Sequence, residues 1–108
     1  MTTNITDFLV IVPTYRRPEF LAAALRSALS QSGVSKQIIV VDDCPDGSAG
    51  PIVASLDPAI IYLKNPHPSS GWPARVRNYG FDTSLQMGIR ARFVHFLDDD
   101  DTVPDGHY

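Results

Sequence analysis

Two groups of acidic residues each follow directly on an apolar run, and they are the residues of this sequence best suited to chemistry. The acids are Asp42 and Asp43 after residues 38–41, and Asp98, Asp99, Asp100 and Asp101 after residues 93–97. Adjacent carboxylates repel one another, so the second group favours a positive partner among its side chains. Carboxylate oxygens are preferred ligands of Mg²⁺ and Mn²⁺, which predicts a divalent-cation site; the alternative is a solvated acidic turn.

Four apolar runs predict buried strands, because each is short and bounded by polar or turn-forming residues. The runs are residues 8–12, 37–41, 60–63 and 93–97. The first is apolar on both faces, which is typical of a central strand in a parallel sheet.

Helical patterns separate these runs. Pro18 suits the first position of a helix, and the apolar residues after it recur at helical spacing until Gly33 ends the pattern. The apolar residues are Phe20, Leu21, Ala24, Leu25, Ala28 and Leu29. A short helix is expected over residues 51–56, and a long one from residue 72 or 73 to about 87, with Gly80 as a mild cost inside it.

The alternation of strands and helices indicates the fold class. Strand, helix and strand within residues 8–41 form a βαβ unit, which is expected to be right-handed. We therefore expect a single α/β, Rossmann-like domain over residues 1–108, with a mostly parallel sheet and helical crossovers. Open α/β sheets bind ligands at the carboxyl ends of their strands, so both acidic groups should face one cleft.

The composition excludes several classes of protein. A length of 108 residues, of which 44% are hydrophobic, suits one ordered domain. The net charge of -3 provides no basic field for nucleic acid. The single cysteine, Cys44, rules out an intrachain disulfide and fits a reduced, cytoplasmic setting. No signal peptide is visible, and no apolar run approaches the ~20 residues of a membrane-spanning helix.

Other classes of metal- or nucleotide-binding protein lack some of their expected residues here. No G-x-G-x-x-G motif follows the first strand, and the G-K-[ST] of a P-loop is missing. An EF-hand loop starting at Asp98 would need glycine at its sixth position, where Val103 stands. Two alternatives stay open. One is a non-catalytic Mg²⁺-binding α/β module, although the lysine that such a module carries after one of its last strands is missing. The other is a nucleotidyltransferase-like metal-dependent domain, although residues 13–18 contain no glycine.

Four segments resemble, in order and spacing, the family 2 glycosyltransferases of the GT-A fold. They are residues 10–18 (VIVPTYRRP), 39–43 (IVVDD), 71–80 (GWPARVRNYG) and 96–101 (FLDDDD). Each segment alone is a weak signal, but together they extend over essentially the whole chain. The resemblance implies the N-terminal, nucleotide-sugar-binding part of an enzyme that transfers a sugar, with inversion, from a nucleotide diphosphate to an acceptor hydroxyl.

The resemblance also implies roles for individual residues. Tyr15 would lie against the base, the pair Asp42 and Asp43 would hydrogen-bond it with Asp43 favoured, and Arg75 or Arg77 would lie near the diphosphate. The implied nucleotide-binding residues are Pro13, Thr14, Tyr15, Asp42, Asp43, Arg75, Arg77, Asp98 and Asp99, and the implied ligands of Mn²⁺ or Mg²⁺, in the family's DxD motif, are Asp98 and Asp100. A UDP-sugar is the favoured donor, with GDP- and dTDP-sugars as alternatives.

The sequence departs from the family pattern in two respects. Cys44 and Pro45 replace the usual Gly-Ser after the aspartate pair, which should stiffen that loop. Family members carry the acceptor-binding half and the catalytic base well downstream, and we expect both to be absent from residues 1–108. No catalytic residue is therefore assigned, and turnover by this chain alone is not expected. A homo-oligomer is one way to cover the sheet edge that would be left exposed.

Overall fold

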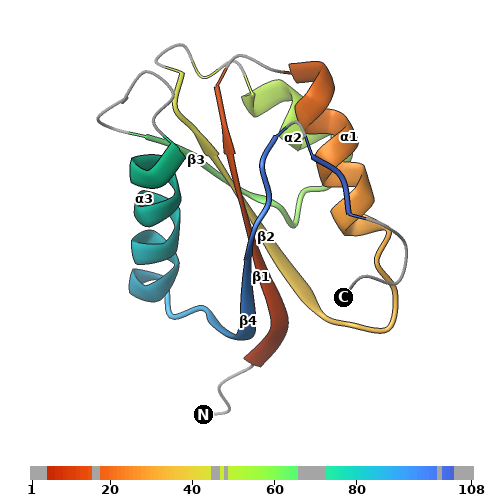
Figure 1. Cartoon of the computed structure of the whole chain (residues 1–108), viewed down its shortest axis with the longest axis vertical. Coiled ribbons are helices and arrows are strands. Elements are labelled where there is room, and N and C mark those ends of the chain that lie inside the picture. The colour runs from red at the N-terminus through yellow and green to blue at the C-terminus, as the bar shows by residue number, and fades with distance from the viewer. Residues whose placement is uncertain are drawn as a thin grey trace.

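The computed structural model describes residues 5–15, 18–44, 47, 49–65, 73–99 and 101–103, and at residues 18 and 73–75 the backbone only. The elements, labelled in Figure 1, are β1 (Ile5–Thr14), α1 (Pro18–Leu29), β2 (Lys36–Asp42), α2 (Gly50–Leu56), β3 (Ile61–Lys64), α3 (Pro73–Gln86) and β4 (Arg90–Phe96). The four strands and three helices expected above are present, with bounds that differ by a few residues; the start of a further helix, which the sequence suggests at residues 104–108, lies outside the described residues.

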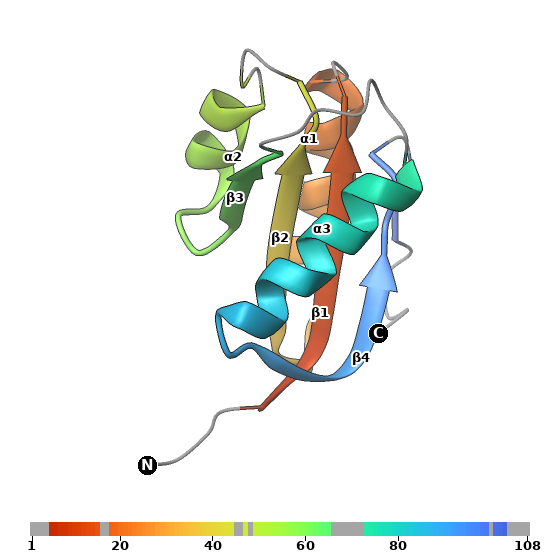
Figure 2. The ribbon, with the colours of Figure 1, turned by 90° about the vertical axis from the view of Figure 1, so that its left-hand side faces the viewer.

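The four strands form one parallel sheet in the order β3-β2-β1-β4, which confirms the predicted fold class. The central strand β1 pairs with β2 on one side and with β4 on the other. The register sets Thr14 of β1 opposite Asp42 of β2, and Asp42 opposite Lys64 of β3. The strands run in the same direction in Figure 2, so their carboxyl ends lie at one edge of the sheet.

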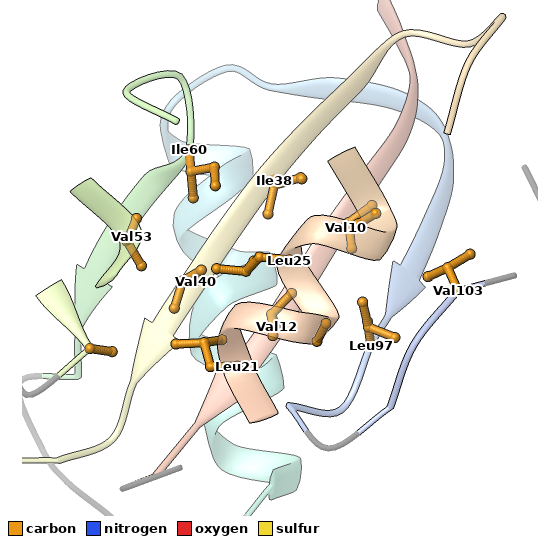
Figure 3. Close-up of a cluster of buried hydrophobic side chains, with 13 residues drawn as sticks. Val10, Val12, Leu21, Leu25, Ile38, Val40, Val53, Ile60, Leu97 and Val103 are labelled. Atoms are coloured by element: carbon orange, nitrogen blue, oxygen red, sulfur yellow. The ribbon is translucent and has the colours of Figure 1, made fainter. Parts of the chain in front are cut away.

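Helices cover both faces of the sheet, with α1 and α2 on one face and α3 on the other (Figure 1, Figure 2). Successive strand residues point to opposite faces, so strands that are apolar throughout supply two separate cores. Val10, Val40 and Leu25 belong to the core under α1 and α2, shown in Figure 3. Ile11 and Val41 belong to the core under α3. Among the described residues, no helix combines the length and the apolar character needed to cross a membrane.

Helix α3 lies very close to the sheet at Gly80. A Cβ atom at this position would lie 2.7 Å from Val41 Cγ2 and 2.9 Å from Ile11 Cγ2, closer than real Cβ atoms pack. The sequence alone marks Gly80 only as a cost to the helix. In the fold, the missing side chain is what allows α3 to rest directly on β1 and β2. Since α3 also carries Arg77, this glycine sets the height of that arginine above the sheet.

The prediction that residues 93–97 form a buried strand is wrong in its burial. β4 is a strand, but Phe93 is 61% exposed, Val94 40% and Phe96 41%. In the described part of the chain β4 pairs only with β1 and forms an edge of the sheet. The apolar pattern of a short run does not distinguish an edge strand from a central one. Leu97, just beyond the strand, is 3% exposed and packs in the core under α1, so the chain is buried where the acids begin.

Candidate functional site

Backbone hydrogen bonds join the ends of neighbouring strands at the carboxyl edge of the sheet. Asp43 N–H donates to Thr14 O (2.9 Å), and Asn65 N–H donates to Asp42 O (2.8 Å). On the other side of β1, Leu97 N–H donates to a carbonyl of that strand. The two acidic groups therefore lie on either side of the end of β1, as the expected parallel pairing requires.

Asp99 connects the second acidic group to the end of β1. Its Oδ2 accepts hydrogen bonds from Thr14 Oγ1–H (3.0 Å) and from Tyr15 N–H (3.4 Å). Thr14 and Asp99 are both buried, at 4% and 8% exposure. Hydrogen-bond donors reduce the cost of burying a carboxylate. Asp99 thereby fixes the point at which the acidic segment leaves the sheet.

Asp98 forms an ion pair with Arg77 of α3. Arg77 Nη2 lies 2.5 Å from Asp98 Oδ1, and the two side chains are 34% and 46% exposed. At that exposure the pair adds little to the stability of the fold. Arg77 Nε is buried and has no hydrogen-bond partner among the described residues. The guanidinium is thus held beside the acids with a donor that an anionic acceptor can satisfy.

Asp42 is fully buried, and both oxygens of its carboxylate accept hydrogen bonds from other groups of the protein. Its Oδ1 accepts a hydrogen bond from Cys44 N–H (3.0 Å), and its Oδ2 accepts from Ala49 N–H (3.0 Å) and Tyr62 O–H (2.7 Å). Charged hydrogen bonds of this length are stronger than neutral ones. Asp42 therefore holds the turn after β2 and joins it to β3.

Asp43 lies beside it and has a different environment. Its side chain is 1% exposed, and its Oδ1 accepts a hydrogen bond from Asn65 Nδ2–H (2.9 Å). Asn65 follows directly on β3 and is 6% exposed. Asp43 and Asn65 form a buried polar pair between the ends of β2 and β3.

The segment that follows the acids is attached to α1. Val103 N–H donates to Ser27 Oγ (2.9 Å), and Gln31 Nε2 donates to Val103 O (3.5 Å). Gln31 is 3% exposed and Val103 is 5% exposed. The acidic segment is therefore anchored at both ends, at Leu97 beside β1 and at Val103 against α1.

The structure brings most of the predicted site residues to one edge of the sheet. Those it describes there are Pro13, Thr14, Tyr15, Asp42, Asp43, Arg77, Asp98 and Asp99. Asp100 and the side chain of Arg75 lie outside the described residues, so their roles stay predictions. Within the described part of the chain, no three His, Cys, Asp or Glu side chains are grouped so that they could hold a metal ion.

The sequence did not single out four residues that shape this edge: Ser27, Gln31, Tyr62 and Asn65. Asn65 had a usable signal, since this polar residue follows an apolar run after a single residue, Lys64, much as the acids follow theirs. Tyr62 would have required the register of β3 against β2. Ser27 and Gln31 contact a residue 76 and 72 positions away, which no local pattern reveals.

The fold is that of the GT-A glycosyltransferases. The chain superposes on the crystal structure of Staphylococcus aureus TarS 1-349, a structure solved with UDP, with a TM-score of 0.73 and 28% sequence identity. The match covers 89% of this chain and 28% of that one.

The particular family follows from the sequence comparison. The family described as Glycosyl transferase family 2 matches residues 9–108, and this chain belongs to it. The resemblance of the four segments is thereby confirmed.

Two curated relatives are bacterial and much longer than this chain. The succinoglycan biosynthesis protein ExoO of Rhizobium meliloti is 32% identical over 100 residues, which are 93% of this chain and 27% of ExoO. The GalNAc(5)-diNAcBac-PP-undecaprenol beta-1,3-glucosyltransferase of Campylobacter jejuni is 35% identical over 100 residues, which are 90% of this chain and 30% of that enzyme. The chain thus spans less than a third of these relatives.

Proposed function

We propose that this chain forms the nucleotide-sugar donor site of a metal-dependent, inverting glycosyltransferase. One arrangement carries the proposal: Asp99 is fixed to β1, Asp98 pairs with Arg77, and the arginine keeps a buried N–H without a partner in the described residues. A diphosphate with its cation needs oxygen ligands and a guanidinium side by side. Membership of family 2 and the likeness to TarS, which was crystallised with UDP, support the proposal.

The base of the nucleotide is proposed to lie against Tyr15 and to hydrogen-bond to Asp43. A carboxylate accepts from a base N–H, which favours uracil, thymine or guanine over adenine. Tyr15 is half-buried and offers an aromatic face, and such stacking contributes ~1–3 kcal/mol in nucleic-acid systems. We therefore favour a UDP-sugar as donor, with GDP- and dTDP-sugars as alternatives.

The proposed ligands of Mn²⁺ or Mg²⁺ are Asp98 and Asp100. Asp98 fits a hard cation, because its carboxylate is 46% exposed at the edge where the acids gather. A cation held there would neutralise the negative charge that develops on the diphosphate as the bond to the sugar breaks. Arg77, which already touches Asp98, adds positive charge that needs no proton transfer.

The remaining step of the proposed reaction involves the acceptor. Its hydroxyl would attack the anomeric carbon in line and lose its proton to a general base. We assign no residue of this chain as that base. The chain spans 27% of one of the two relatives described above and 30% of the other. We therefore propose that the general base and the acceptor site correspond to parts of these relatives that the match does not cover.

Calorimetric titration with UDP, GDP and dTDP, each with Mn²⁺ and with EDTA, tests the donor site. We expect one nucleotide to bind in the presence of Mn²⁺, and much more weakly after chelation. Asp100→Ala should reduce its affinity to the value measured with EDTA. Asp101→Ala is the matched control, because this neighbouring acid is exposed and is not a proposed ligand.

Two results would contradict the donor-site proposal. One is a folded chain that binds none of the three nucleotides. The other is binding of equal strength with Mn²⁺ and with EDTA, which would remove the metal from the proposal.

Asp43→Ala tests the proposed contact with the base. We expect UDP affinity to fall about tenfold, since a hydrogen bond to a charged group contributes ~1.5–3 kcal/mol and part of that is recovered by water. The control is Asp57→Ala, which removes a carboxylate whose Oδ1 caps Ala59 N–H (2.8 Å) in an exposed turn. Circular dichroism checks that both variants fold, and unchanged UDP affinity in Asp43→Ala would exclude the contact.

A further inference from the structure

The two acids at the end of β2 are both buried, but their described hydrogen-bond partners differ. Asp42 is 0% exposed and accepts hydrogen bonds from at least three described donors, which use both of its oxygens. Two of those donors are backbone groups of the turn after β2, at Cys44 and Ala49, and the third is the hydroxyl of Tyr62 on β3. Asp42 thus stabilises the local structure after β2, while the neighbouring Asp43 is proposed to hydrogen-bond to the base of the nucleotide.

Tyr62 also shapes the turn sterically. Gly47 has a φ of +67°, and a Cβ atom there would lie 3.3 Å from Tyr62 Oη. A Cβ atom at Gly50 would lie 3.6 Å from the tyrosine ring. Gly47 therefore lies close against the hydroxyl of Tyr62, and Gly50, at the start of α2, lies against its ring.

The same group of contacts reaches Asp43. Asn65 donates its backbone N–H to Asp42 O (2.8 Å) and its side-chain amide to Asp43 Oδ1 (2.9 Å). The end of β3 is therefore joined to both acids, to Asp42 through Tyr62 and to Asp43 through Asn65. A shift of β3 or of the turn would move the Asp43 carboxylate as well.

We propose that Tyr62 and Asp42 are positioning residues that act on nucleotide binding through Asp43 and the turn, without touching the nucleotide themselves. This inference rests on the proposed donor site. It gives the two acids different roles: Asp42 orients the turn after β2, and Asp43 binds the base of the nucleotide. The hydrogen bond from the Tyr62 hydroxyl to Asp42 can be removed by deleting one oxygen atom, in Tyr62→Phe. The other two described donors to Asp42 are backbone groups, which a substitution does not remove.

The test is Tyr62→Phe, with Tyr79→Phe as the matched control. Both variants lose one phenolic hydroxyl, but Tyr79 lies on α3 at the opposite face of the sheet. We expect Tyr62→Phe to reduce UDP affinity roughly fivefold or more, the lower range of coupling between separate sites. Binding of inorganic pyrophosphate with Mn²⁺ should stay within error of the unmodified chain, because Tyr62 lies on β3 and the acids follow β4, at opposite edges of the sheet.

Two outcomes would overturn the inference. One is UDP affinity in Tyr62→Phe equal to that of Tyr79→Phe. The other is an equal loss for UDP and for pyrophosphate, which would mean that the tyrosine supports the fold in general and has no specific effect on the base side of the site.

Amide hydrogen exchange separates this inference from the donor-site proposal. If the unmodified chain binds no nucleotide, the donor site fails, but the contacts of Tyr62 can still be measured. We expect the amides of Cys44 and Ala49 to exchange faster in Tyr62→Phe than in Tyr79→Phe. Equal protection in the two variants would show that the hydroxyl does not hold the turn, and would overturn the positioning role directly.

Discussion

Asp99→Ala should reduce metal-dependent UDP binding at least 100-fold and also lower the stability of the fold. The Asp99 carboxylate accepts hydrogen bonds from Thr14 Oγ1–H and Tyr15 N–H, and it is 8% exposed. Its removal takes the acceptor away from the buried hydroxyl of Thr14, at a cost of ~1–3 kcal/mol. It also frees the segment that carries the proposed cation ligands, so binding should suffer more than stability. Urea denaturation followed by circular dichroism and calorimetric titration give the two quantities.

Asp99→Asn separates the two effects. The amide oxygen can still accept from Thr14, so stability should recover most of the loss, while the negative charge is gone. We expect binding to stay weak if the charge matters for the cation or the ribose. Full recovery of binding in Asp99→Asn would show that Asp99 serves only to hold the segment. Wild-type binding in Asp99→Ala would remove this residue from the site altogether.

Gly80→Ala should destabilise the fold, although alanine is the better helix former. Helix propensity alone would favour alanine by ~1 kcal/mol. Against this, the new Cβ would lie 2.7 Å from Val41 Cγ2 and 2.9 Å from Ile11 Cγ2, within the core under α3. Overpacking of this kind costs ~1–3 kcal/mol, and Gly80→Val should cost more. Thermal and urea denaturation measure the change.

The control for this prediction is Asn78→Ala, two residues earlier on α3 and exposed to solvent. It improves helix propensity without adding an atom to the core, so it should be neutral or slightly stabilising. A stabilised Gly80→Ala would mean that α3 is free to lift away from the sheet. In that case the position of Arg77 would not be fixed by packing either.

Most of the fold was predictable because its signals are local. The apolar runs of β1 and β2 and the helical stripe of α1 require no knowledge of distant residues, and a helical crossover between two strands then indicates that they are parallel. The burial of β4 was not predictable, since Phe93 and Phe96 suit an edge and a centre equally well. The role of Gly80 was not predictable either, because a close approach depends on Val41 and Ile11, which belong to other elements.

The candidate site was predictable as a set of residues but not as a set of contacts. Parallel pairing placed Asp42, Asp43 and the second acidic group at one edge. Which acid turns inward is decided by partners far along the chain, such as Thr14, which lies 85 residues before Asp99. The different environments of Asp42 and Asp43 likewise depend on β3, and adjacent identical residues give no sequence signal for such a difference.

The anchoring of the acidic segment has a consequence for the entropy of binding. Leu97 is held beside β1 and Val103 against α1, so the chain between them begins and ends at fixed points. A free acidic peptide would lose much backbone freedom on surrounding a cation, at ~1–2 kcal/mol per ordered residue. Here part of that loss has already occurred during folding, so the segment would be preorganised for the cation that we propose it binds. Folding of the hydrophobic core and affinity for that proposed ligand would thereby be linked through Ser27 and Gln31, two residues of the α1 region that lie outside the acidic segment.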